Sequence, residues 1–308
     1  MTPDEGTVPG AQPAAILRPA ATPADFNPAG RTPAATPAVQ FQDVSLSFGE
    51  NHALDHVSFS MNPGETRVVV GAAGSGKTML LKTAMGLVPA DSGHIRLFGE
   101  EVTGRKESDL FDLRSKVGIL FQEGGLFDSL TIAENVAYPF LNRRVLDAAG
   151  EAQAWSEEQV EQRVREALRF VELEHTLEKF PSELSGGMRR RVGIARAVVT
   201  EPALVLYDSP TAGLDPITAY TIITLVLMER DLRNATTIMV THRYQDGHLM
   251  ANFRYNPSSG KIEPAEGSQR STRFLVMKEG GLIFEGSQTE LLASTDPYVQ
   301  KFARPGSS

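Results

Sequence analysis

The residues with the clearest chemical meaning form a glycine-rich segment that ends in a lysine and a threonine. Residues 71–78 read Gly-Ala-Ala-Gly-Ser-Gly-Lys-Thr and fit the pattern G-x-x-x-x-G-K-[ST]. Glycines let backbone N–H groups curve around phosphate oxygens, the lysine reaches the terminal phosphates, and the threonine hydroxyl binds Mg²⁺. We therefore predict a phosphate-binding loop, called the phosphate loop below; it consists of Gly71, Ala72, Ala73, Gly74, Ser75, Gly76, Lys77 and Thr78.

Two further segments carry groups of matching chemistry. Asp208 follows the apolar run 203–207, and a carboxylate at the end of a buried strand is the natural second contact to a magnesium ion. Ser185, Gly186 and Gly187 precede a helical pattern, where the serine caps the helix and the glycines let the backbone approach a phosphate. A chain that already binds phosphates at one helix N-terminus needs a second one only if two molecules enclose the nucleotide.

These groups must be positioned by strands and helices. The runs 67–70, 203–207 and 237–240 are short and apolar, which predicts buried parallel strands. A helix is predicted over 79–86, just after the phosphate loop, with Gly86 at its end. The glycine-rich segment thus lies between a buried strand and a helix, which is the context that phosphate binding requires.

The remaining chain is predicted to supply a scaffold of strands first and helices later. Two strands are expected at 39–48 and 53–61. Residues 124–183 are mostly helical in pattern, with a capping box that starts at Ser156. A hairpin is expected over 273–284, followed by two short helices.

Composition limits the classes of protein to which this chain can belong. Its 308 residues suit one large α/β domain or two modest ones. The formal charge of −8 argues against a protein that neutralises nucleic-acid phosphates, so no nucleic-acid partner is expected. The absence of cysteine excludes disulfides, thiolate metal sites and a cysteine nucleophile. The apolar run 222–228 is much shorter than the ~20 residues that span a bilayer, so any membrane role must come through a partner.

Three segments lie outside the periodic pattern. Proline and alanine make up 18 of residues 1–38, which predicts a disordered tail because such a segment buries too little apolar surface to offset its ordering entropy. Residues 252–272 are polar and contain turn residues, which predicts an inserted surface hairpin with a flexible extension. Residues 304–308 are expected to form a short tail.

In these motifs the chain resembles the ATP-binding subunits of ABC transporters. The phosphate loop matches the Walker A motif of that family, and the other hallmarks follow in the family's order. They are Phe48 as the aromatic residue that stacks on adenine, Gln122 in the Q-loop, 184–188 as the signature, 204–208 as Walker B, 212–215 with Asp215 as the D-loop, and His242 as the switch histidine.

The resemblance implies a fold, a reaction and partners. It implies a P-loop NTPase domain over 39–303, with an antiparallel β subdomain and a helical subdomain at about 123–190. It implies that ATP is hydrolysed with Mg²⁺ held by Thr78, Gln122 and Asp208. The catalytic positions that it implies are Gln122, Asp208, Ser209 and His242. The partners it implies are a second ATPase subunit, in a homodimer or a heterodimer, and an integral membrane permease. The permease would hold the chain at the cytoplasmic face of the inner membrane.

Two stretches are most similar to the ATPases of Mce/Mla-type lipid transport systems, namely 124–139 and 181–191. The C-terminal segment 286–302 is also similar to theirs. This resemblance implies phospholipid or another hydrophobic cargo. Importers of amino acids or ions are the nearest alternatives.

Ser209 is the main departure from the family pattern, which places glutamate directly after the Walker B aspartate. A serine hydroxyl hydrogen-bonds a water but does not take its proton near pH 7, and general-base help is worth ~10²–10⁴-fold. We therefore expect tight ATP binding with slow intrinsic turnover. A regulatory module with little or no hydrolysis remains the alternative.

A second, minor feature is the basic triplet Arg189–Arg191, for which a solvated helix face with salt bridges is expected.

Soluble ABC proteins that act on chromosomes or ribosomes form the rival class. Chromosome-type members need a long coiled coil between Walker A and the signature, but the 105 residues between Thr78 and Leu184 contain no heptad pattern. Ribosome-acting members carry two such domains, whereas this chain has one set of motifs. The sequence therefore favours a transporter subunit.

Overall fold

A computed structural model describes residues 36–142, 155–265 and 272–304. Residues 1–35 of the predicted disordered tail 1–38, the flexible extension at 266–271, residues 305–308 of the predicted tail 304–308 and part of the helical region, 143–154, lie outside the described residues. Ala38, at the end of the predicted disordered tail, is instead buried, and its N–H donates to the Met61 carbonyl oxygen at 2.8 Å. The described strands are β1 Val39–Phe48, β2 Asn51–Met61, β3 Thr66–Gly71, β4 Ser92–Leu97, β5 Glu100–Glu101, β6 Val117–Leu120, β7 Leu204–Asp208, β8 Thr236–Val240, β9 Phe253–Asn256, β10 Lys261–Pro264, β11 Thr272–Lys278 and β12 Gly281–Gly286. The α-helices are α1 Lys77–Ala84, α2 Phe111–Ser115, α3 Ile132–Asn142, α4 Glu157–Phe170, α5 Gly186–Val198, α6 Pro216–Arg233, α7 Tyr244–Asn252, α8 Gln288–Ala293 and α9 Pro297–Gln300.

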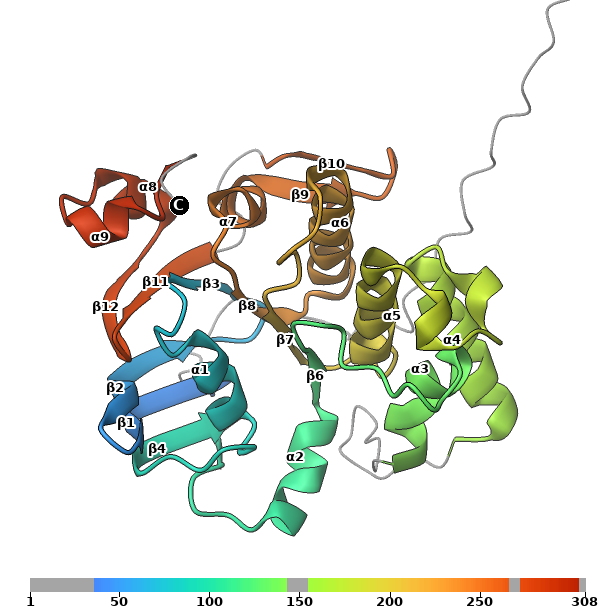
Figure 1. Ribbon diagram of the computed structural model, residues 1–308, viewed down its shortest axis with the longest axis horizontal. Coiled ribbons are helices and arrows are strands. Elements are labelled where there is room, and N and C mark those ends of the chain that lie inside the picture. The colour runs from blue at the N-terminus through green and yellow to red at the C-terminus, as the bar shows by residue number, and fades with distance from the viewer. Residues whose placement is uncertain (1–35, 143–154, 266–271, 305–308) are drawn as a thin grey trace, which may run out of the picture.

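A six-stranded sheet in the order β12-β11-β3-β8-β7-β6 forms the centre of the molecule (Figure 1). All of its neighbouring strands are parallel except β12, which is antiparallel to β11. Every residue of β3, β7 and β8 is buried, as expected for parallel strands that are covered on both faces. The three predicted strands at 67–70, 203–207 and 237–240 are confirmed.

A second, antiparallel sheet in the order β2-β1-β4-β5 lies beside helix α1 and strand β12 of the central sheet (Figure 1). β1 and β2 pair from Val39 opposite Met61 to Phe48 opposite Asn51, with register shifts on the way. These irregularities explain why the apolar alternation along β1 is imperfect, because each shift moves the following side chains relative to the sheet faces. The implied antiparallel β subdomain is confirmed.

The helical part follows β6 and consists of α3, α4 and α5 (Figure 1). α4 begins with the predicted capping box, in which the Ser156 hydroxyl accepts a hydrogen bond from the Gln159 N–H and the Gln159 side chain accepts one from Ser156 N–H. Its inner face buries Val164 and Leu168 against the main core. The implied helical subdomain is confirmed for the residues that the structure describes.

The C-terminal hairpin makes a second strand pairing that was not predicted from the sequence. β11 pairs with β12 as predicted, but it also joins the central sheet in parallel with β3, where Thr272 lies opposite Thr66 and Met277 opposite Gly71. The chain then forms α8 and α9, the two predicted short helices. The last strand pair therefore flanks the strand that leads into the phosphate loop.

The polar stretch after α7 contains the predicted hairpin, formed by β9 and β10. Two adjacent residues of α6 attach it to the body of the protein. The Arg230 guanidinium donates to the carbonyl oxygens of Met250 and Phe253, and the Asp231 carboxylate accepts from the Tyr255 N–H at 2.7 Å. The described part of the insertion is thus a fixed surface element.

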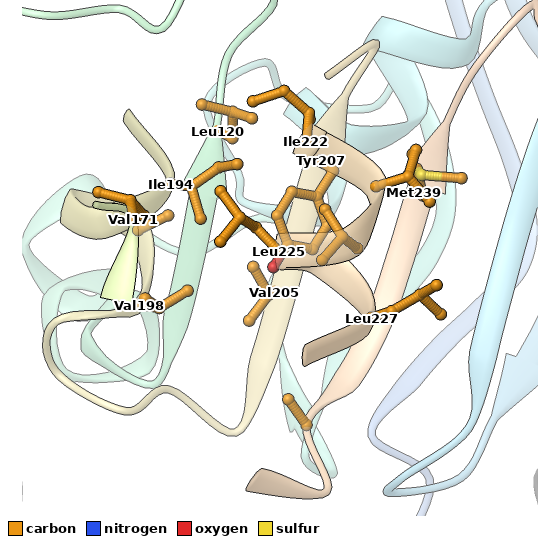
Figure 2. Packing of buried hydrophobic residues seen from close by; sticks show 14 of the residues in the cluster. Leu120, Val171, Ile194, Val198, Val205, Tyr207, Ile222, Leu225, Leu227 and Met239 are labelled. Atoms are coloured by element: carbon orange, nitrogen blue, oxygen red, sulfur yellow. The ribbon is translucent and has the colours of Figure 1, made fainter. Parts of the chain in front are cut away.

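The main hydrophobic core lies between α5, α6 and the central sheet, with the Tyr207 ring at its centre (Figure 2). Tyr207 is fully buried and lies among Ile194, Ile222 and Leu225. Because Tyr207 directly precedes Asp208, packing in this core also fixes the position of that carboxylate.

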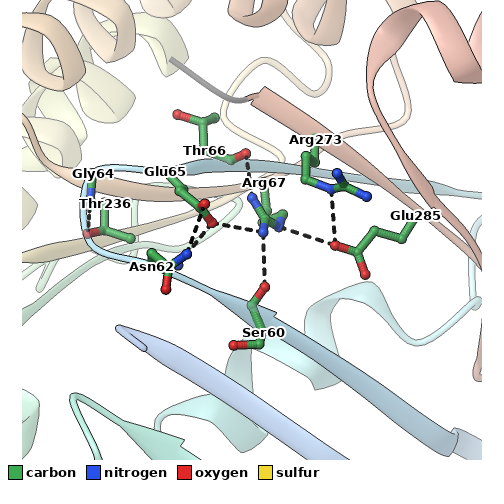
Figure 3. A network of polar contacts seen from close by, with 9 residues as sticks. All are labelled: Ser60, Asn62, Gly64, Glu65, Thr66, Arg67, Thr236, Arg273 and Glu285. Carbon is green, nitrogen blue, oxygen red and sulfur yellow. Dashed lines mark hydrogen bonds and ion pairs between the residues drawn. The ribbon is translucent and has the colours of Figure 1, made fainter. Parts of the chain in front are cut away.

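A buried arginine joins the antiparallel sheet to the central one (Figure 3). Arg67, on β3, is only 3% exposed, and one of its terminal nitrogens donates to the Ser60 carbonyl oxygen and to the Glu65 carboxylate, each at 2.9 Å. Its Nε lies 3.8 Å from a Glu285 carboxylate oxygen on β12, and that oxygen also contacts Arg273 Nε at 3.3 Å. Burial lowers the pKa of Arg67, while the two carboxylates oppose that shift. The network connects β2, β3, β11 and β12 at the end of the sheets opposite the phosphate loop.

A second buried titratable residue, Glu229, belongs to α6. Burial raises the pKa of Glu229 from 4.5 to about 7, although Arg233 Nε at 3.3 Å from its carboxylate opposes the shift. Both carboxylate oxygens and the Tyr207 hydroxyl are buried and, within the described residues, accept or donate no hydrogen bond. A buried carboxylate that accepts no hydrogen bond disfavours its own ionisation, and the Arg233 ion pair offsets this only in part.

We expect Glu229→Gln to stabilise the protein at high pH. Because the folded-state pKa is raised, the neutral carboxyl is favoured in the folded protein; the benefit is complete below pH 4.5 and is lost as the pH rises through about 7. The difference corresponds to about 3 kcal/mol in the free energy of unfolding at pH 8. Urea unfolding at pH 5 and pH 8 checks this: the variant should match the wild type at pH 5 and exceed it at pH 8. Glu178→Gln, at an exposed position, is the control, and an equal gain at both pH values would contradict the prediction.

Candidate nucleotide-binding site

The predicted site residues come together at the carboxyl ends of adjacent parallel strands. β3 leads into the phosphate loop, β8 ends just before His242, β7 ends at Asp208, and β6 leads to Gln122. The register sets Asp208 opposite Val240, and the Thr241 N–H donates to the Val69 carbonyl oxygen at 3.0 Å. In open α/β sheets this edge is where ligands bind.

The phosphate loop ends in a helix whose first turn is free to bind an anion. Gly76 precedes α1 with φ 98°, a left-handed conformation that favours glycine, and no side chain caps this helix N-terminus. By contrast, serine or aspartate side chains cap α4, α5, α6, α8 and α9. A Cβ on Gly76 would also collide with the Ala53 carbonyl oxygen. The uncapped N–H groups and the helix dipole make this turn suited to phosphate oxygens.

Lys77 lies folded within the loop. Its ammonium group donates to the carbonyl oxygens of Gly71 at 2.8 Å and Ala72 at 2.7 Å, and it is 3.3 Å from the Ser75 hydroxyl. Burial lowers the pKa of Lys77, and the nearby Asp208 carboxylate opposes that shift. The Lys77 amino group thus lies within the loop, next to the uncapped helix turn.

Thr78 and Asp208 form a pair of oxygen ligands. The Thr78 hydroxyl donates to the Asp208 carboxylate at 3.3 Å, which joins residues 130 positions apart in the chain. Hydroxyl and carboxylate oxygens are the ligands that Mg²⁺ prefers, and this ion is commonly bound by one or two carboxylates together with substrate phosphates. These two residues therefore fit the predicted Mg²⁺ position beside the phosphate loop. Gln122, the third predicted ligand, follows β6 and is exposed.

Ser209 occupies the position after Asp208 in a defined geometry. Its φ is 50°, its N–H donates to the Val240 carbonyl oxygen at 3.0 Å, and its hydroxyl lies 3.3 Å from the Asp208 carboxylate. The serine hydroxyl thus lies next to the carboxylate of Asp208, a predicted Mg²⁺ ligand. His242, two residues beyond Val240, is exposed, so its imidazole is available to a nucleotide.

Asp246 is a residue of this site that the sequence analysis missed. It is 2% exposed on α7, and its carboxylate accepts hydrogen bonds from the hydroxyls of Thr211 and Thr241, the latter at 2.7 Å. Burial raises the pKa of Asp246, while the threonine hydroxyls oppose that shift. Asp246 therefore connects the turn after Asp208 to the segment just before His242. Nothing in the sequence signals this contact, because it depends on how α7 turns back onto the sheet.

The Ser185 turn lies at a different place from the phosphate loop. The Ser185 hydroxyl caps α5 by accepting from the Met188 N–H at 3.2 Å, as predicted. α5 packs on α3, α4, α6 and β6, whereas α1 packs on β2, β3, β4 and β7, and Figure 1 shows the two helices on opposite sides of β7. Ser185 and Gly186 are exposed, and a Cβ on Gly186 would meet open space.

The remaining predicted residues surround this arrangement. Asp215 caps α6 by accepting from the N–H groups of Ile217 and Thr218, each at 3.0 Å. Phe48, at the end of β1, is 53% exposed, which leaves its ring available for stacking.

The salt bridge expected for the basic triplet is present at Arg191, whose guanidinium lies 3.9 Å from the Glu172 carboxylate, but the shorter contacts of the triplet are of another kind. Arg189, Arg190 and Arg191 each donate to a backbone carbonyl oxygen, those of Leu184, Gln122 and Val171 respectively. The contact between Arg190 Nε and Gln122, at 2.9 Å, attaches α5 to the segment after β6. Periodicity places these arginines on one helix, but it does not show which loops come within their reach.

The chain matches the family model for ABC transporters over residues 54–212. It is 33% identical over 283 residues to the chloroplastic protein TRIGALACTOSYLDIACYLGLYCEROL 3 of Arabidopsis thaliana, covering 86% of this chain and 73% of that protein. It is 38% identical over 212 residues to the methionine import ATP-binding protein MetN of Rhizobium etli, covering 69% of this chain and 56% of that protein.

The chain is also similar in fold to a solved structure of an ATP-binding cassette. It is a dimeric, post-hydrolysis state of an ATP-binding cassette bound to ADP and Pi, with a TM-score of 0.65 and 27% sequence identity. The match covers 81% of this chain and 98% of that one.

Proposed function

We propose that this chain, which belongs to the ABC transporter family as an ATP-binding subunit, hydrolyses ATP to move phospholipid or another hydrophobic cargo through a membrane permease. The observation that carries the catalytic part is the convergence of Lys77, Thr78 and Asp208 where β3 and β7 end. Within this family such a site couples ATP hydrolysis to transport. We assign this cassette to residues 39–303.

The separation of the two helix N-termini supports an ATP-bound dimer. The phosphate loop and the exposed Ser185 turn lie on opposite sides of β7, so one nucleotide is best enclosed by the loop of one subunit and the turn of another. Each ATP would then contact Lys77 of one copy and Ser185 and Gly186 of its partner. Closure requires that ATP bind the closed dimer more tightly than the open one.

A groove next to Gln122 supports a permease contact. It has a volume of about 150 Å³ and is lined by aromatic side chains and an arginine. The rings of Phe127 and Tyr138 have centroids 4.5 Å apart, and the Arg196 guanidinium lies 5.7 Å from the centre of Phe127. Arg196 also donates to the Gly124 carbonyl oxygen, so this groove is attached to the loop that follows Gln122. A permease segment bound in this groove would be displaced when Gln122 and the loop after it move.

The membrane location follows from such a partner. In the parts of the chain that the structure describes, no helix combines the length and apolar character needed to cross a bilayer. Attachment to the inner membrane, on its cytoplasmic face, would therefore depend on the permease.

Hydrophobic cargo is supported by sequence similarity. The segments 124–139 and 181–191 resemble those of Mce/Mla-type ATPases, and the Arabidopsis relative is named for a galactolipid. The MetN relative, which is named for methionine import, supports the alternative of a small-solute importer. Ser209 supports a third possibility, an ATP-binding regulatory module with little hydrolysis.

The cargo is tested on the complex isolated from native membranes in mild detergent. We expect a permease to co-purify, phospholipid to be identified in the complex by mass spectrometry, and ATP hydrolysis in nanodiscs to respond to the phospholipid composition. Stimulation by methionine with no response to lipid would contradict the lipid assignment. Recovery of the chain from membranes without any permease would instead favour the regulatory module.

A further inference from the structure

The phosphate loop is contacted by a side chain from the far C-terminal end of the chain. The Tyr298 hydroxyl, on α9, accepts a hydrogen bond from the Ala72 N–H at 3.0 Å. The same hydroxyl donates to the Met277 carbonyl oxygen at the end of β11, at 3.1 Å. One oxygen therefore joins three segments, and the first contact spans 226 positions in the sequence.

This contact occurs where the loop begins to turn away from β3. Gly71 pairs with Met277, and a Cβ on Gly71 would collide with the Met277 carbonyl oxygen. The loop thus starts in close contact with β11, and its next N–H group points to Tyr298. Because the Ala72 carbonyl oxygen also accepts from Lys77, both polar backbone groups of Ala72 are fixed, one by the lysine and one by the tyrosine.

Tyr298 is itself held by several contacts. Asp296 caps α9 by accepting from the Tyr298 N–H at 2.7 Å, and the Phe302 ring lies 5.3 Å from the tyrosine ring, centroid to centroid. The ammonium groups of Lys278 and Lys301 lie 5.5 and 5.7 Å from the centre of the ring. Val299, its neighbour, is 1% exposed and belongs to the main core. The hydroxyl is therefore presented by a side chain with little freedom to move.

We propose that Tyr298 is a positioning residue for ATP binding, which holds the start of the phosphate loop in the conformation that presents Lys77 to the phosphates. The physical basis is preorganisation: a loop that is already ordered loses less conformational entropy when it binds its ligand. The proposal rests on the ATP-binding part of the proposed function and is independent of the cargo.

The test compares full-length wild type with Tyr298→Phe, which keeps the ring and removes only the hydroxyl. One net hydrogen bond corresponds to roughly 3- to 10-fold in binding. We expect ATP–Mg²⁺ to bind the variant more weakly by that factor, with a melting temperature within about 4 °C of that of the wild type. We also expect faster amide hydrogen exchange in peptides that cover residues 71–74, measured without nucleotide. Tyr255→Phe, on the β9–β10 hairpin, is the matched control and should behave as wild type.

Each outcome decides the proposal. Wild-type loop exchange in Tyr298→Phe would overturn it, and so would faster exchange with unchanged ATP affinity. An equal loss of affinity in Tyr255→Phe would also overturn it, since the effect would then not be specific to the hydroxyl. If wild type itself failed to bind ATP, the proposed function would fail, whereas the exchange measurement would still show whether Tyr298 orders the loop.

Discussion

Ser209→Glu is expected to raise the rate of ATP hydrolysis by roughly 10²–10⁴-fold. A carboxylate next to Asp208 would accept the proton of the attacking water, which the serine hydroxyl does not do near neutral pH. This factor corresponds to roughly 3–5 kcal/mol in the activation barrier. Steady-state phosphate release at saturating ATP, with the complete transporter assembly, measures it.

The geometry at Ser209 is compatible with the substitution. The residue already has φ 50°, and the hydrogen bond from its N–H to Val240 depends on the backbone alone. A glutamate therefore adds no new backbone strain relative to serine, since both are L residues with a Cβ. The side chain is half-buried, and its hydroxyl lies 3.3 Å from the Asp208 carboxylate.

Ser209→Gln provides the control for size and polarity. It has nearly the same shape as the glutamate variant but lacks a basic carboxylate, so its rate should stay close to that of wild type. A glutamate variant that is no faster than wild type would mean that the absence of a general base does not limit the reaction. His242 or another group would then have to orient the water well enough.

A slow site has consequences for the assembly. In the proposed dimer, tight ATP binding with slow turnover would keep the two subunits closed for longer, because ATP would join them. Either a different ATPase subunit supplies the competent site, or hydrolysis waits for the permease. Comparing the rate of the isolated chain with that of the purified complex distinguishes these cases.

Lys77→Ala is expected to reduce ATP hydrolysis by roughly 10³-fold, since removal of one preorganised donor to a developing phosphate charge typically costs 10²–10³-fold and this donor is a full cation. The ammonium group also contacts the carbonyl oxygens of Gly71 and Ala72, so the loop loses its internal support as well. ATP affinity should fall together with the rate. Equilibrium binding and steady-state phosphate release measure the two effects.

Lys82→Ala is the matched control, because Lys82 lies in the last turn of the same helix, α1, and not at the phosphate loop. It should keep the affinity and the rate of wild type. Retention of full activity in Lys77→Ala would show that the loop does not bind the phosphates of the hydrolysed ATP.

Much of the fold could be predicted from the sequence, because local patterns specify it. The three buried strands, the capping box at Ser156 and the helix cap at Ser185 all depend on residues that are close in the chain. The phosphate loop is likewise a contiguous motif, so Lys77 and Thr78 could be assigned before any contact was known.

Contacts between distant segments could not be predicted. Arg67 lies in a strand that reads as apolar, and its carboxylate partners are Glu65 nearby and Glu285 far along the chain. Asp246 and Tyr298 carry no motif, although the first lies four residues after His242. The backbone contacts of the triplet at 189–191 could not be predicted for the same reason, because its carbonyl acceptors are set by the packing of α5.

The chemistry available to this protein follows from the residue types along the chain: the phosphate loop, an acidic strand end, a capped glycine turn and a serine where the resemblance to the family leads us to expect glutamate. Which of these groups meet depends on how the chain folds. The tertiary structure brought Thr78 to Asp208, connected Thr211 to Thr241 through Asp246, and placed the Tyr298 hydroxyl on the Ala72 N–H. The reason is physical: residue type and local spacing fix short-range hydrogen bonds and helix caps, whereas a contact across 130 or 226 positions exists only after the sheet has set its strand order and register.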